Sequence, residues 1–185
     1  MTPHSRRALF TGAAAALTLA ACGNGIGSQG GANIDARVDA TLAFLDSHYP
    51  GTRDLRDKAA GMLVMPLVTE ASFGFGGSYG RGALRVNGVT VDYYSATQAS
   101  FGIQAGAQQY AHVLYFMTEE ALADFRASSG WSAGADIEYA MNDKGGNLSA
   151  DTTTVLAPVV AVVFGQAGLL AGASVKGTKY TRIIP

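Results

Sequence analysis

The chain has 185 residues, which is about the size of one domain. Its 13 Lys and Arg residues are balanced by 14 Asp and Glu residues, and this argues against a nucleic-acid-binding protein, which would present a strongly basic surface. Hydrophobic residues make up 48% of the sequence and charged residues only 15%, a composition that excludes a disordered chain. The single cysteine, Cys22, excludes an intramolecular disulfide framework and any cysteine-rich metal site. We therefore expect one globular domain and a separate role for Cys22.

Residues 1–21 have the pattern of an export signal. Arg6 and Arg7 give a positive start, and the apolar run that follows is shorter than the ~20 residues that a membrane-spanning helix needs. The run ends in Leu19-Ala20-Ala21-Cys22, which resembles the lipobox of bacterial lipoproteins. This resemblance implies cleavage before Cys22 and acylation of its thiol. The arginine pair fits a twin-arginine signal and an ordinary basic start equally well.

The residues after Cys22 predict the cellular location of the protein and a flexible tether. Position 23 is Gly and not Asp, which by resemblance to Gram-negative lipoproteins implies an outer-membrane anchor facing the periplasm. Residues 22–33 are rich in Gly, Ser, Asn and Gln, and we expect them to form a flexible tether to a domain over 34–185. Loss of residues 1–21 takes the formal charge from −1 to −3.

Two helices are predicted at the start of the domain and one further along the chain. Apolar residues recur at steps of three and four over 34–49, and Pro50-Gly51 ends that helix. A second helix is expected over 52–60 with Thr52 as its N-cap. A third, short helix is expected to begin after Thr118 and to end before Gly130.

From Gly61 onward the pattern predicts many short strands. The clearest signal is Asn87-Gly88 between two apolar segments, which predicts a β-hairpin. The helices do not alternate with the strands, so a βαβ fold is not expected. We expect an α+β fold, a mainly antiparallel β-sheet or partial barrel with two N-terminal helices and one short inserted helix. Further strands are expected at 62–65, 72–76, 93–96, 100–107, 113–117, 137–140, 153–164, 168–173 and 180–184.

Two kinds of glycine motif could indicate phosphate binding or serine-esterase activity, but the residues around them do not support either function. The glycine block at 74–82 lacks both the G-x-G-x-x-G order and the following helix of a phosphate-binding loop, so strand bending or close packing explains it better. Ser78 and Ser132 each lie in a G-x-S-x-G match, which leaves a small serine esterase as a remote alternative. His48 and His112 have no second ligand at metal spacing, so we expect no metal and no cofactor.

Four blocks in order along the chain resemble the SYLF domain, a lipid-binding module of bacterial lipoproteins and eukaryotic membrane-associated proteins. They are Gly61-Met62-Leu63-Val64-Met65-Pro66, Gly74-Phe75-Gly76-Gly77-Ser78-Tyr79-Gly80-Arg81-Gly82-Ala83-Leu84, Ser100-Phe101-Gly102-Ile103-Gln104-Ala105-Gly106 and Phe164-Gly165-Gln166-Ala167-Gly168-Leu169. The resemblance implies phospholipid binding, with phosphoinositides as the ligands of eukaryotic members, and no catalytic activity.

Cations are the expected partners of a lipid phosphate, through Arg forks or Lys point charges. The candidates outside the helices are Arg81, Arg85, Lys176, Lys179 and Arg182. The eight tyrosines and Trp131 are candidates for a membrane interface, although most are expected in the core. The polar face of the helix expected over 34–49 carries more acids than bases, which argues against purely electrostatic membrane attraction. The alternative is an envelope structural or protein-interaction module whose only membrane contact is the anchor, with no protein partner specified.

Overall fold

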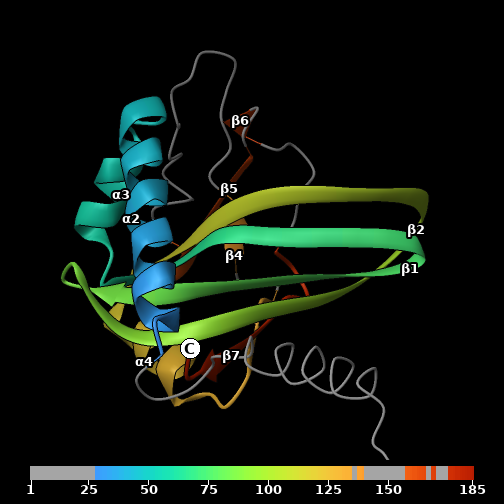
Figure 1. The fold of residues 1–185 in the computed structure, drawn as a ribbon. Helices are drawn as coiled ribbons and strands as arrows, with labels where there is room; N and C mark the ends of the chain where they lie inside the picture. Colours follow the sequence, from blue (N-terminus) through green and yellow to red (C-terminus); the bar gives the residue numbers. More distant parts are fainter. Residues whose placement is uncertain (1–27, 135–136, 140–156, 166–167, 170–174) are drawn as a thin grey trace, which may run out of the picture.

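The computed structural model describes residues 28–134, 137–139, 157–165, 168–169 and 175–185. Its three described helices and seven strands form the expected α+β fold (Figure 1). In chain order they are α2 (Gly30–His48), α3 (Thr52–Lys58), β1 (Gly61–Val86), β2 (Val89–Phe116), α4 (Glu119–Ala127), β3 (Trp131–Ser132), β4 (Ile137–Tyr139), β5 (Val159–Gly165), β6 (Gly168–Leu169) and β7 (Lys179–Ile183). The predicted signal peptide and Cys22 lie outside the described residues.

Strands β1 and β2 form one long antiparallel ribbon that folds back on itself. The ribbon begins at the turn Asn87-Gly88, where φ is 50° and 79°, as a tight hairpin turn requires. Pairing then continues to Gly61 and Phe116, and each strand runs away from the helices and returns (Figure 1). The hairpin prediction is confirmed, whereas the prediction of several short strands in this region is wrong. Three β-bulges break the alternation of side chains that would have revealed two long strands.

Glycines allow the two halves of the folded ribbon to touch. A Cβ added at Gly82 would collide with the carbonyl oxygen of Val64, and one at Gly80 would lie 2.7 Å from the carbonyl oxygen of Leu67. The missing side chains therefore let the return half of β1 cross its own first half at backbone contact. This agrees with the packing interpretation of the glycine block and not with a phosphate-binding loop.

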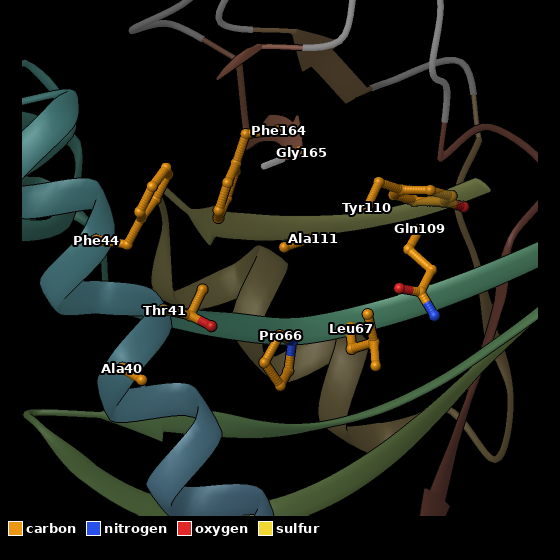
Figure 2. Close-up of a pocket in the computed structure, with 10 residues that line it drawn as sticks. All are labelled: Ala40, Thr41, Phe44, Pro66, Leu67, Gln109, Tyr110, Ala111, Phe164 and Gly165. Atoms are coloured by element: carbon orange, nitrogen blue, oxygen red, sulfur yellow. The ribbon is translucent and has the colours of Figure 1, made fainter. Parts of the chain in front are cut away.

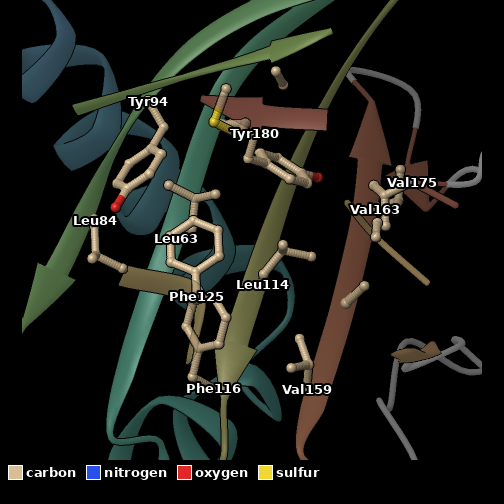
Figure 3. Packing of buried hydrophobic residues seen from close by; sticks show 14 of the residues in the cluster. Leu63, Leu84, Tyr94, Leu114, Phe116, Phe125, Val159, Val163, Val175 and Tyr180 are labelled. Carbon is tan, nitrogen blue, oxygen red and sulfur yellow. The ribbon is translucent and has the colours of Figure 1, made fainter. Parts of the chain in front are cut away.

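The curled sheet buries both of its faces. β2 pairs with β1 along its whole length, with β7 near its start and with β5 near its end. Inside the curl lie Leu63, Leu114 and Phe116, and α4 closes this core with Phe125 (Figure 3). The outer face is covered by α2 and α3. β5 serves both cores, because its side chains alternate between them and are buried from Val159 to Phe164.

Helix α2 starts earlier than the sequence indicates. It begins at Gly30, so residues 30–33 of the expected tether are helical. The start packs tightly, since a Cβ at Gly31 would lie 2.9 Å from the Tyr93 hydroxyl oxygen, and the Ser28 hydroxyl donates to the carbonyl oxygen of Pro185 at 2.7 Å. These contacts come from residues distant in sequence, which a local pattern cannot report.

The other helix ends differ in detail from the sequence predictions. The N-cap of α3 is Gly51, and Thr52 is the first residue of the helix. The Thr52 hydroxyl does not cap the helix but donates to the carbonyl oxygen of Tyr49 at 2.8 Å. The third helix is confirmed, and the Thr118 hydroxyl caps it by accepting from the Ala121 amide at 3.1 Å.

Candidate functional site

The acidic side of α2 faces the sheet and is neutralised there. Arg85 of β1 lies 2.7 Å from a carboxylate oxygen of Asp39 and 3.6 Å from one of Asp35. Asp35 also accepts hydrogen bonds from the hydroxyls of Thr90 and Tyr93, both at 2.7 Å. Burial, and then the hydrogen bond to Asp35, raises the pKa of Tyr93. Asp35 and Asp39, two of the acids on the polar side of this helix, therefore hold α2 to the sheet.

A groove with a volume of about 970 Å³ runs between α2 and the folded ribbon. Arg37 of α2 and Arg81 of β1 both line it. Its remaining walls carry mainly small and neutral polar groups, among them Asn33, Thr69 and Tyr79, and the Tyr79 side chain is 55% exposed. We refer to this hollow as the α2–β1 groove.

The α2–β1 groove is suited to an anion. None of the described residues that line it is acidic. The first turn of α2 lies along the groove and contains no acidic residue. Guanidinium groups match the geometry of phosphate oxygens, and Arg37 and Arg81 supply two of them.

An apolar pocket, whose lining is drawn in Figure 2, shares two lining residues with the groove. It has a volume of about 230 Å³, and α2 contributes Ala40, Thr41 and Phe44 to its wall. The rings of Phe44 and Phe164 stack with their centroids 5.8 Å apart, and Figure 2 shows both rings on one side of the pocket. We refer to this hollow as the Phe44 pocket.

The groove and the pocket meet at Pro66 and Leu67, which line both. These two residues form a bulge in β1, since the register of β1 against β2 shifts between Met65 and Val68. Proline has no amide hydrogen to give to the sheet, and a bulge is one of the few places where a strand accepts it. The bulge carries two apolar side chains opposite α2.

Of the five predicted cations, the structure places only Arg81 on the wall of the groove. Arg85 is engaged with α2, as described above, and Arg182 lies 3.4 Å from a carboxylate oxygen of Asp92. Lys179 is exposed on the same sheet face as Tyr79, because both pair with Thr97 of β2. Lys176 is exposed in the turn before β7.

Arg37 and Phe44 were not among the predicted site residues. Both belong to a stripe on one side of α2 that comprises Asn33, Arg37, Thr41 and Phe44, spaced by four and three residues. This helical spacing is visible in the sequence, but which side of the helix borders a groove depends on how α2 sits on the sheet.

The serine–histidine pair that an esterase would need is not formed at Ser78. The Ser78 hydroxyl is buried and has no hydrogen-bond partner among the described residues, while His112 Nε2 lies 2.7 Å from the Tyr180 hydroxyl oxygen. Ser132 is exposed, whereas His112 is completely buried. The esterase alternative therefore has no geometric support from these groups.

Two further searches of the described residues bear on the site. No cluster of three or more His, Cys, Asp or Glu side chains in the described ranges has the arrangement needed for a metal ion. None of the described helices combines the length and the apolar character required to cross a membrane.

The described residues form a curled antiparallel sheet with a groove between α2 and β1. Residues 97–182 match the family model described as Ysc84, Las17-binding protein actin regulator. No match was found among curated proteins. This match confirms the resemblance to the SYLF family over residues 97–182. Members of that family are in general non-catalytic.

Proposed function

We propose that this protein is a lipid-anchored bacterial envelope lipoprotein whose SYLF domain binds anionic phospholipid, with the headgroup in the α2–β1 groove. The observation that carries the proposal is the groove itself, in which Arg37 and Arg81 lie without an acidic lining residue among those described. The chain as a whole has a formal charge of −1, so bulk attraction to an anionic membrane is absent and a local cationic site must supply it.

The expected anchor would hold the groove near the membrane. Ser28 lines the groove and lies six residues after Cys22. Six residues span at most about 21 Å when fully extended. Acylation of Cys22, which the lipobox resemblance implies, would therefore keep Ser28 at the edge of the groove within that distance of the periplasmic leaflet of the outer membrane. One additional binding contact makes a lipid anchor much more stable.

Each arginine should contribute measurably to membrane binding. A basic residue near an anionic lipid surface is worth about 1 kcal/mol, which corresponds to about fivefold in the partition coefficient. The full chain with Cys22→Ser, which cannot be acylated, is floated with vesicles of phosphatidylcholine alone or mixed with an equal part of phosphatidylglycerol. We expect binding to the mixed vesicles and about fivefold weaker binding for Arg37→Gln and for Arg81→Gln.

Lys58→Gln is the matched control, because it also removes one positive charge but from an exposed position at the end of α3. Equal losses for all three variants would show a response to net charge only and would contradict a headgroup site in the groove. Absence of binding to both kinds of vesicle would contradict the lipid-binding function itself.

A protein-interaction module is the second candidate function. The Phe75 side chain is 79% exposed at the bent end of the ribbon, and the matching family model is described as a Las17-binding protein. Exposed aromatic side chains are common anchors of protein interfaces. A photo-cross-linking amino acid at position 75 tests this in cells: a specific protein adduct would favour the module, and adducts to lipid alone would count against it.

A further inference from the structure

We propose that the Phe44 pocket takes an acyl chain of the same lipid whose headgroup lies in the α2–β1 groove, so that the domain binds a single lipid molecule partly withdrawn from the bilayer. This inference rests on the proposed function and adds the chemical class of its ligand: an anionic headgroup joined to a hydrocarbon chain. The argument comes from the continuity, polarity and size of the two hollows.

The two hollows form one path along α2. Asn33 and Arg37 border the groove, and Ala40, Thr41 and Phe44 border the pocket, so successive turns of the same helix line the whole path. Pro66 and Leu67 lie on the opposite side of the path where the two hollows meet. The two hollows therefore border one another at Pro66 and Leu67, and the proposed ligand extends past these two residues.

Polarity changes along this path in one direction. The groove has arginine, asparagine and hydroxyl groups near the start of α2, and the Phe44 pocket is lined mainly by apolar atoms one to two turns later. From Arg37 to Phe44 the helix rises about 10 Å. An amphiphile with its phosphate at Arg37 would place the first part of its hydrocarbon chain beside the stacked rings of Phe44 and Phe164.

The Phe44 pocket is large enough for part of a hydrocarbon chain. Its volume of about 230 Å³ exceeds the ~150 Å³ of an engineered apolar cavity that binds benzene. Polar side-chain groups are a minority in its wall, since among the lining residues they come from Thr41, Gln109 and the hydroxyl of Tyr110.

The test uses soluble single-chain lipids below their micelle concentration. Hexanoyl- and octanoyl-lysophosphatidylglycerol are titrated into the full chain with Cys22→Ser, with deacylated glycerophosphoglycerol as the headgroup alone. Each buried methylene group strengthens binding by up to about fourfold, so the octanoyl lipid should bind up to about 15-fold more tightly than the hexanoyl lipid. Nuclear Overhauser contacts from the chain to the rings of Phe44 and Phe164 should appear in the unaltered pocket.

The pocket is then filled by Ala40→Phe, with Ala43→Phe as the matched control on the same helix. Ala43 is exposed and is not among the residues that line either hollow. We expect Ala40→Phe to remove the dependence on chain length and Ala43→Phe to retain it. Thermal unfolding of both variants establishes that they are folded.

The possible results separate this inference from the proposed function. If mixed vesicles bind and Arg81→Gln weakens that binding, but chain length has no effect, the headgroup site stands and the acyl-chain site is refuted. If chain length matters equally in Ala40→Phe and no contacts to the two rings appear, the chain lies elsewhere and the inference is also refuted. If neither vesicles nor single-chain lipids bind, both proposals fail together.

Discussion

Mild acid should destabilise this domain through His112. The imidazole lies inside the curl, completely buried, between the rings of Tyr110 and Tyr180. Its Nε2 shares a hydrogen bond with the Tyr180 hydroxyl, and its Nδ1 has no partner among the described residues. A protonated ring would need an acceptor at both nitrogens, so burial lowers the pKa of His112 from 6.5 to about 3.

The direction and the size of the effect follow from this difference in pKa. In the unfolded chain His112 takes up a proton below pH 6.5, whereas in the folded protein it stays neutral down to about pH 3. Stability is therefore lost progressively as the pH falls through this window. At pH 5, 1.5 units below the unfolded pKa, the loss is about 2 kcal/mol. This figure depends only on the unfolded pKa, provided that the folded pKa lies well below 5.

Urea unfolding followed by circular dichroism at pH 7.5 and pH 5 measures the loss directly. The paired variant is His112→Gln, whose amide can still bond to Tyr180 but does not titrate, and the control is His48→Gln at an exposed position. We expect the free energy of unfolding to fall by about 2 kcal/mol between the two pH values in the wild type and in His48→Gln, but much less in His112→Gln. An equal fall in His112→Gln would refute the reasoning, because some other group would then be responsible. Carboxylates titrate mostly below pH 5, outside the interval between the two measurements.

Three other substitutions test the fold. Gly82→Ala should destabilise the domain by about 2 kcal/mol or more, because the new Cβ meets the backbone of Val64, which cannot move aside, as well as the Met65 side chain. Gly106→Ala has nothing within 4 Å and should be nearly neutral, and urea unfolding compares the two. Thr118→Ala removes the cap of α4 and should cost about 1 kcal/mol in the same assay. Arg85→Gln leaves the two acids of α2 without their cation and should cost about 1–3 kcal/mol, with faster amide hydrogen exchange in α2 than in α4.

Each of these expectations has a result that would contradict it. Equal stability of Gly82→Ala and Gly106→Ala would mean that the two halves of the ribbon do not touch at this crossing. An unchanged Thr118→Ala would mean that the cap hydrogen bond contributes nothing to stability. Uniform acceleration of exchange in Arg85→Gln would indicate global destabilisation and not release of α2.

Local signals in the sequence identified the elements whose structure is determined locally. The turn at Asn87-Gly88 and the cap at Thr118 were found because the residue types themselves favour those conformations. The length of β1 was missed because the Pro66-Leu67 bulge and two buried sheet faces remove the two-residue period. Gly82 approaches the backbone of Val64, and this contact depends on the tertiary fold. The residues next to Gly82 in the sequence do not indicate it.

The candidate site was predictable only in part, for the same reason. Arg81 was selected for its residue type and strand position, and it does line the groove. Arg85 and Arg182 have the same residue type, but their acidic partners, Asp39 and Asp92, lie far from them in sequence. Arg37 is not distinguished in the sequence from the other polar residues of its helix. Which side of α2 borders the groove depends on the orientation of α2 on the sheet, and long-range contacts set that orientation.

The folded ribbon also implies an order of assembly. Val86 and Val89 are separated only by the two-residue turn, and every further pair along the ribbon is brought within reach by the pair before it. Loop closure is therefore cheap at each step, and the ribbon can zip from the turn outward. The pairing of β7 with the start of β2 joins segments at distant points of the chain, so it closes a far larger loop. The part of the sheet formed by β7 and β3 should then form late, after the two longest strands are already in register.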